Sequence, residues 1–284
     1  MQSKIIRIMI TAIVTLLLLS STGLAKDTEM MSSTEALEGE ELMSNSPEGE
    51  DSWGYHVAFK YWSTDFTKSR IFQDIRGDKA FEGTAPVGGL AIGLSKGKHA
   101  VSLALLGTLS EYSAETRYTT VGATSNVITN IRDESKIKTL YVDIRLHRLI
   151  TENINASFGY KYLRHDWEGM THDLTTKGSS PYEIEFSAHG PGVGVNAALP
   201  IAESKFAISG AFFLVPYGWV TVNHSNGYES TEAAWLVTPE IGLRYSLFET
   251  TNIAVGYRWE ANGSYESGPA DIIHGPSFDV AISF

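Results

Sequence analysis

The last nine residues of the chain, 276–284, alternate strictly between large apolar side chains and small or polar ones. The apolar positions are Phe278, Val280, Ile282 and Phe284. A period of two residues is that of a β-strand, in which successive side chains point to opposite faces. A soluble domain seldom leaves such a row of large apolar side chains in water. The terminal segment therefore predicts a fold in which one face of the sheet meets an apolar environment.

The same alternation recurs in nine segments upstream, so the chain is predicted to form ten strands, although eight or twelve remain compatible with it. The segments are 53–62, 87–95, 100–109, 137–149, 155–167, 182–199, 206–215, 233–247 and 253–260. In one of them the apolar positions change from even (Ile184, Phe186) to odd (Val193) numbers. Because Gly190-Pro191-Gly192 lies at the change, we expect a β-bulge there.

The connections between these segments alternate in length, which points to a transmembrane barrel. The short ones lie near 96–98, 149–153, 200–204 and 248–251, and the long polar ones span 63–84, 110–135, 168–181, 216–232 and 261–274. Short turns at one end, long loops at the other and an even number of antiparallel strands are typical of transmembrane β-barrels. A β-sandwich also has alternating strands, but it would not need an apolar row on every one of them.

The N-terminal region predicts export. Lys4 and Arg7 precede an apolar run, 8–19, and Gly23-Leu24-Ala25 supplies small residues for cleavage, so residues 1–25 are predicted to be a signal peptide. Residues 26–52 hold nine acidic residues against one lysine, which predicts a disordered periplasmic leader, or alternatively a docking tail. The barrel domain is then 53–284. The absence of cysteine excludes disulfides and thiolate metal sites.

The signal peptide, the apolar rows and the strand that ends in Phe284 together resemble the outer-membrane β-barrel proteins of Gram-negative bacteria. The resemblance implies an all-β, antiparallel transmembrane barrel in the cell outer membrane. It also implies two partners: outer-membrane lipid with lipopolysaccharide, and the barrel assembly machinery, which recognises a C-terminal strand such as the one ending in Phe284. The net charge of −11 and the lack of a basic patch give no reason to expect nucleic acid binding.

Nine charged residues fall on the inward faces of the predicted strands and are the candidate pore-lining residues. They are Lys60, Asp143, Arg145, Lys161, Glu240, Arg244, Arg258, Glu260 and Asp279. Because five cations nearly balance four anions, the set predicts either a structural ion network or a charged constriction. We expect a small porin-like channel for small polar solutes. The alternative is a surface structural or binding protein whose closed barrel is an anchor.

Neither an enzyme nor a cofactor is expected from the sequence. Ten strands resemble the omptins, surface proteases with that barrel size and with acidic pairs and an Asp–His pair at the outer rim. The acid–histidine neighbours here are His165 with Asp166, His172 with Asp173, and Asp271 with His274. None has the i, i+2 spacing that puts two side chains on one strand face. The histidines show no metal spacing, and no Ser–His–acid arrangement suggests a lipid hydrolase. An outer-membrane protease or lipid hydrolase remains the weaker alternative.

Overall fold

The computed structural model describes residues 53–68, 84–110, 112–121, 128–202, 204–266 and 271–284. The predicted signal peptide, 1–25, and the acidic leader, 26–52, lie outside these residues. In the described part of the chain, no helix has the length and apolar character needed to cross a membrane.

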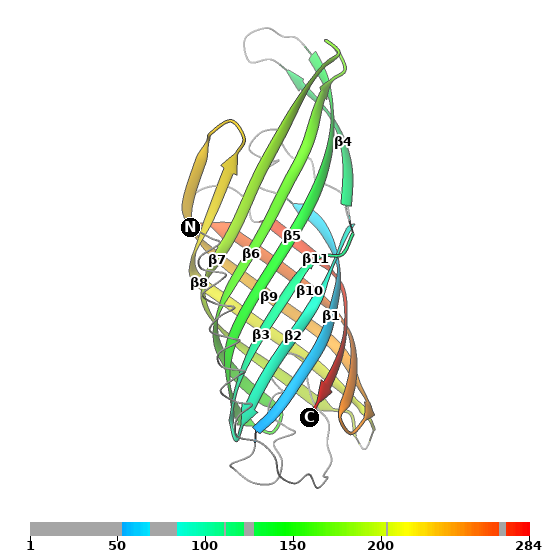
Figure 1. The fold of residues 1–284 in the computed structure, drawn as a ribbon, viewed down its shortest axis with the longest axis vertical. Coiled ribbons are helices and arrows are strands. Elements are labelled where there is room, and N and C mark those ends of the chain that lie inside the picture. Colours follow the sequence, from blue (N-terminus) through cyan, green and yellow to red (C-terminus); the bar gives the residue numbers. More distant parts are fainter. Residues whose placement is uncertain (1–52, 69–83, 111, 122–127, 203, 267–270) are drawn as a thin grey trace, which may run out of the picture. The chain divides into compact units, whose positions relative to one another are not determined.

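The described residues form one antiparallel sheet that closes into a barrel (Figure 1). Its strands are β1 (Trp53–Lys68), β2 (Thr84–Lys96), β3 (His99–Thr108), β4 (Tyr112–Val121), β5 (Ile128–Thr151), β6 (Ile154–Asp173), β7 (Gly178–Pro200), β8 (Phe206–His224), β9 (Glu229–Phe248), β10 (Thr251–Ser264) and β11 (Asp271–Ser283). Each strand pairs with its neighbours in sequence order, except that β3 pairs with β5 instead of β4, and β1 pairs with β11. Since β3 and β4 occupy successive stretches of β5, the barrel wall has ten strands, which confirms the predicted fold class.

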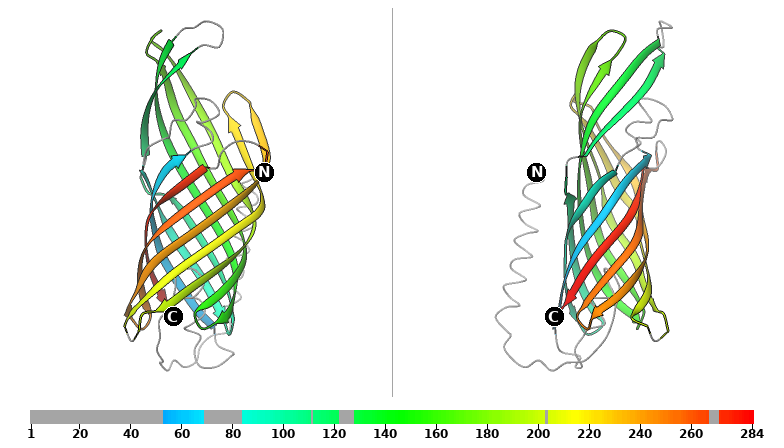
Figure 2. Two further views of the ribbon diagram at one scale, coloured as in Figure 1. Left: turned by 180° about the vertical axis from the view of Figure 1, so that it is seen from behind. Right: turned by 90° about the vertical axis from the view of Figure 1, so that its right-hand side faces the viewer.

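The ends of the wall are joined by backbone hydrogen bonds between the two termini of the domain. The Phe284 N–H donates to the Tyr55 carbonyl at 2.8 Å, and the Tyr55 N–H donates to the Phe284 carbonyl at 3.1 Å. The four predicted short turns are confirmed. They lie at the end of the barrel that also holds the C-terminus (Figure 2).

The prediction of long loops at the other end is wrong, because much of their length is strand. Residues predicted as loop between 110 and 135 form β4 and the start of β5, and β6 to β9 also continue well past their predicted ends. Only four residues, 174–177, separate β6 from β7. The predicted loops 63–84 and 261–274 begin and end with strand residues, because β1 and β10 continue into them and β2 and β11 start before they end. Residues 69–83 and 267–270 lie outside the described residues. Most of the strand segments that were predicted as loops carry polar residues on both faces, so the alternation that marks a strand next to an apolar medium is weak or missing in them.

The predicted β-bulge lies where expected, but on the neighbouring strand. Between the pairs His189↔Trp219 and Val193↔Leu214, β7 advances by four residues and β8 by five, so the extra residue belongs to β8. Accordingly β7 keeps its even-numbered side chains inside from Ile184 onward, and the predicted change of phase in β7 is wrong. The change occurs in β8, where Val215 and Val220 both point inward.

The outer surface of the wall carries apolar rows that end at two groups of aromatic side chains. In one group, His189 lies against Tyr160, Tyr162 and Trp219, and its Nδ1 is hydrogen-bonded to the Tyr160 hydroxyl at 2.6 Å. The second group consists of Tyr257, Trp259 and His274. Such aromatic girdles mark the interface of a membrane-spanning strand with water.

Beyond the first aromatic group the outward residues become charged. Along β6, Arg164 and Asp166 follow Tyr162, and their side chains are joined by a 2.6 Å ion pair. We call the strands beyond this level the extension: β4 with residues 128–138 of β5, 164–173 of β6 and 178–187 of β7. The extension stands on one side of the barrel (Figure 2).

Candidate functional site in the barrel interior

The inward side chains of the barrel form three layers that follow one another along the strands. On β1 the order from the terminal end is His56, Lys60 and Trp62, all of which are buried. The same order recurs on another strand of the wall. Strand β5 carries His147, then Arg145 and Asp143, then Tyr141, and all four are buried as well. The interior is therefore built of a polar layer, a charged layer and an aromatic and aliphatic layer.

The polar layer lies near the short turns and consists of histidine, serine and asparagine side chains. His56 is hydrogen-bonded through Nδ1 to the Ser283 hydroxyl at 2.9 Å and through Nε2 to the Ser95 hydroxyl at 3.2 Å. Since Ser95 is on β2 and Ser283 on β11, His56 links three strands at the place where the barrel closes. Asn196 Nδ2 donates to Asn155 Oδ1 at 2.9 Å on the opposite wall. These partners compensate for the removal of polar groups from water.

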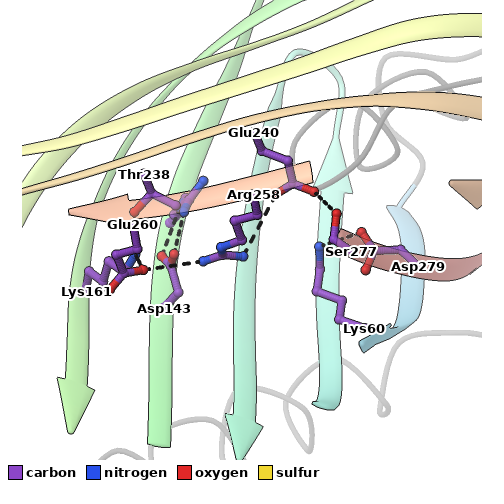
Figure 3. Close-up of polar contacts among 10 residues, drawn as sticks. Lys60, Asp143, Lys161, Thr238, Glu240, Arg258, Glu260, Ser277 and Asp279 are labelled. Carbon is purple, nitrogen blue, oxygen red and sulfur yellow. Dashed lines mark hydrogen bonds and ion pairs between the residues drawn. The ribbon is translucent and has the colours of Figure 1, made fainter. Parts of the chain in front are cut away.

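The charged layer, which we call the ion belt, contains all nine residues predicted to line a pore. Figure 3 labels seven of them: Lys60, Asp143, Lys161, Glu240, Arg258, Glu260 and Asp279. Its central contact is between Lys161 on β6 and Glu260 on β10, whose charged atoms lie 2.5 Å apart. Lys161 Nζ also donates to the Thr238 hydroxyl of β9 at 2.5 Å. One lysine on one wall is thereby tied to two strands of the opposite wall.

The other members of the ion belt extend this contact around the interior. Arg258 lies 3.9 Å from Glu260 and 3.9 Å from Glu240, and Glu240 accepts a hydrogen bond of 3.2 Å from the Ser277 hydroxyl. The remaining pairs are Lys60 with Asp279 at 3.3 Å and Arg145 with Asp143, whose Oδ1 lies 2.9 Å from Arg145 Nε. Arg244 on β9 is fully buried within the same layer. Charges removed from water require such pairing.

The third layer was not predicted. It is a cluster of sixteen buried apolar residues, which we call the plug: Trp62, Val87, Leu106, Ile137, Tyr141, Leu163, Trp167, Ile184, Phe186, Ala188, Phe213, Val215, Val220, Ala234, Leu236 and Ile273. Its members come from nine of the ten strands of the barrel wall, and each is at most 5 % exposed. The sequence contains one sign of this cluster, which is the apparent change of phase at Ile184 and Phe186. These are large apolar residues on the inward face.

Cations of the ion belt lie against aromatic rings of the plug. The Arg145 guanidinium lies 4.2 Å from the centre of the Phe213 ring, and that of Arg258 lies 5.0 Å from the centre of the Trp62 ring. A cation over an aromatic face is attracted to it, the more so when both are shielded from water. The ion belt and the plug therefore pack as one continuous structure.

The acid–histidine neighbours considered for catalysis do not face one another. His165 points inward and bonds the Thr139 hydroxyl at 2.9 Å, whereas Asp166 points outward to Arg164. Asp173 instead accepts hydrogen bonds within the β6–β7 turn.

The two other neighbours are likewise turned to different partners. His172 is bonded to the Ser179 hydroxyl at 2.9 Å, and His274 is bonded to the Tyr257 hydroxyl at 2.6 Å on the outer surface. Asp271 is buried on the inward side. No group of histidine and acidic residues suited to a metal ion occurs among the described residues.

Comparison with known proteins supports the fold. No family model matches the sequence, and no curated protein matches it. The outer-membrane protease OmpT from Escherichia coli superposes with a TM-score of 0.50 at 12 % identity, covering 89 % of this chain and 100 % of that chain. The translocator domain of the autotransporter NalP from Neisseria meningitidis has a TM-score of 0.45 at 8 % identity, covering 83 % of this chain and 89 % of that one. At such identities the likeness concerns the fold alone, which is that of outer-membrane β-barrels.

Proposed function

We propose that this protein is a closed outer-membrane β-barrel that anchors the extension outside the membrane, and that it is not an open diffusion channel. The observation that carries the proposal is the burial of the ion belt. Eight of its nine residues are at most 8 % exposed, and the Glu240 side chain is 10 % exposed. A pore that passes water would leave the residues lining its narrowest part in contact with water.

The plug supports the same conclusion independently. Trp62, Trp167, Phe186 and Phe213, which lie on four different strands, are each at most 2 % exposed. An eight-stranded barrel is just filled by its side chains, and ten strands enclose only a little more space. Four large aromatic side chains, the ion belt and the polar layer account for that space.

The channel hypothesis retains one supporting observation. Several inward residues of β2 and β3 are small, namely Gly89, Ala91, Gly93, Ser102 and Ala104, although Val87 and Leu106 of the same strands belong to the plug. A path through the barrel would have to run along these small side chains. The two hypotheses differ in one measurable quantity, which is the conductance of the folded protein in a planar lipid bilayer.

We expect the wild type to be silent in planar bilayers. The double substitution Trp62→Ala and Phe213→Ala should produce conducting events because it removes two rings that the arginines Arg258 and Arg145 pack against. Trp53→Ala is the matched control, since Trp53 is on the outer surface at 47 % exposure, and it should stay silent. If the wild type conducts and Arg258→Ala shifts its selectivity toward cations, the protein is a channel and the closed-anchor proposal fails.

A further inference from the structure

A row of exposed side chains crosses four strands of the wall at the end of the barrel that holds the short turns. Trp53 on β1 is paired with Lys96 on β2. Lys96 is in turn paired with His99 on β3, and His99 with Arg148 on β5. Since neighbouring strands lie about 4.8 Å apart, the row is roughly 14 Å long. We call these four residues the basic row, together with Lys98 in the turn between β2 and β3.

The basic row lies on the outer surface of the wall. All five of its side chains are exposed. The residues that adjoin Lys96, His99 and Arg148 along their strands are buried and point inward; they are Ser95, Ala100 and His147. Successive side chains of a strand point to opposite faces. The positive charges of the row are therefore directed toward the surroundings of the barrel.

Three members of the basic row take no part in ion pairs. Lys98, His99 and Arg148 make none with the residues that the structure describes. The Leu149 N–H donates to the Lys98 carbonyl at 3.0 Å, which holds the β2–β3 turn against the end of β5. Lys98 and Arg148 thus belong to one patch. The fourth basic residue, Lys96, lies with its ammonium 5.6 Å from the centre of the Trp53 ring.

The positive charge is confined to this sector of the short-turn end. The turns that adjoin the basic row, 97–98 and 152–153, hold one acidic residue, Glu152, against the three charges of Lys96, Lys98 and Arg148. The two other short turns, 201–205 and 249–250, hold one lysine and two glutamates. The exposed residues at the ends of β6, β8 and β11 are apolar; they are Ile154, Phe206 and Phe284.

A second row, which is apolar, lies directly beside the basic row on the same outer face. It lies two residues further into the wall, and its members are paired with one another across the same four strands; they are Tyr55, Leu94, Val101 and Leu146. Leu146 is 58 % exposed on this surface. The outer face therefore changes from apolar to basic over one step of the strands, as the membrane does between its hydrocarbon core and its headgroups.

We propose that the basic row is a binding site for the headgroup of an anionic phospholipid in the leaflet next to the short turns. The phosphate binds to Arg148 and Lys98, and the acyl chains lie along the apolar row. The inference goes beyond the proposed function, because it concerns the outer surface of the barrel and names a ligand for it.

The chemistry of each side chain suits this ligand. The guanidinium of Arg148 can donate to two phosphate oxygens at once, whereas a lysine ammonium acts as a compact charge. An imidazole N–H of His99 can donate a further hydrogen bond. The Trp53 ring combines an apolar body with an N–H donor, which suits the level of the headgroups. Because cations outnumber carboxylates here, a headgroup with a net negative charge fits better than a zwitterionic one.

Neutralising the row tests the site. The double variant Lys98→Gln and Arg148→Gln should bind phosphatidylglycerol about thirtyfold more weakly than wild type, because two positive charges near an anionic headgroup are removed. Native mass spectrometry of the refolded protein in detergent, with phosphatidylglycerol added in steps, measures the bound lipid. Lys205→Gln is the matched control, since it removes a cation from another short turn, and it should bind as wild type does. Equal binding by all three proteins would overturn the inference.

Two competitors test the chemistry of the ligand. Phosphatidylcholine with the same acyl chains has no net charge, and it should bind wild type and the double variant alike. Glycerol phosphate has the headgroup without the chains, and it should not displace phosphatidylglycerol at equal concentration. Displacement by glycerol phosphate would make the basic row a site for soluble anions, and preference for phosphatidylcholine would remove the charge from recognition. Either result contradicts the inference.

The acidic leader, 26–52, is the other candidate occupant, since it directly precedes Trp53 and carries nine acidic residues. The variant Glu48→Gln, Glu50→Gln and Asp51→Asn separates the two. If lipid occupies the row, this variant should bind phosphatidylglycerol at least as tightly as wild type. If wild type binds none and the variant does, the leader occupies the row and the inference fails.

The outcome is independent of the proposed function. A wild type that conducts in planar bilayers but binds phosphatidylglycerol through the basic row keeps this inference and removes the closed barrel. A silent wild type whose lipid binding does not depend on Lys98 and Arg148 keeps the closed anchor and removes the lipid site.

Discussion

The barrel wall and the extension are built from the same strands but follow different physical rules. Within the wall, β6 shows large apolar side chains such as Phe158 outside and buried residues such as Lys161 and Leu163 inside. In the extension, the same strand carries Arg164, Asp166 and Glu168, and its ion pairs are partly or largely exposed. A change of surroundings along a single strand thus decides which side chains it can carry.

The comparison shows where ion pairs contribute most to stability. In the wall, Glu260 and Lys161 are both sealed from water, so each is needed to balance the other. In the extension, Lys138 and Glu168 form a pair of 3.1 Å with both side chains 53 % exposed, so water can take the place of either partner. Similar distances therefore correspond to different energies.

The largest predicted effect concerns the buried ion pair of the barrel interior. Glu260→Ala should lower the free energy of unfolding by about 3–5 kcal/mol, because it leaves Lys161 and Arg258 with less compensation inside the barrel. Glu168→Ala is the matched control and should cost no more than about 1 kcal/mol. Urea unfolding of the refolded protein in lipid vesicles measures both. Equal losses for the two variants would mean that the ion belt is in contact with water.

A smaller effect is expected for two hydroxyl groups, one in the barrel interior and one in the exposed β8–β9 hairpin. Thr238→Val keeps the shape of the side chain but removes the partner of the Lys161 ammonium, which should cost about 1.5–3 kcal/mol. Thr221→Val removes an exposed hydroxyl that lies 3.0 Å from Thr231 in the β8–β9 hairpin, and it should change stability by less than about 0.5 kcal/mol. The same unfolding assay applies. If Thr221→Val is the more damaging of the two, the hairpin rather than the interior limits stability.

The smallest effect concerns the tip of the extension and depends on pH. Hydrogen bonds from Thr176 and Thr175 hold the pKa of the Asp173 carboxyl below its usual value. A lowered pKa means that the carboxylate stabilises the turn above the unfolded-state pKa, and that this is lost as the pH falls through the folded-state pKa. The protection of the tip amides, which is their exchange rate compared with that of an unstructured chain at the same pH, should therefore fall at acidic pH in wild type. In Asp173→Asn the protection should lack this acid step, and an identical step in the variant would assign it to another group.

Sequence periodicity predicted the barrel well because the alternation of inward and outward side chains is a local property of each strand. Residues such as Val57 and Phe59 lie outward, and Lys60 and Arg258 lie inward, as expected from a period of two next to an apolar medium. The same logic failed in the extension, where 168–173 and 178–181 are strand but polar on both faces. Hydrogen bonding to neighbouring strands, which the sequence does not display, determines their structure.

The amino-acid sequence by itself predicted a barrel of about ten strands, the inward and outward faces of most of them, and the set of nine charged residues that face the interior. The tertiary structure alone decided which of these charges meet, since Lys161 and Glu260 are 99 residues apart and are brought together only when the barrel closes. It also decided that Trp62, Tyr141 and Phe213 fill the interior. Packing across a closed barrel depends on the stagger of ten strands, and no single strand contains that information.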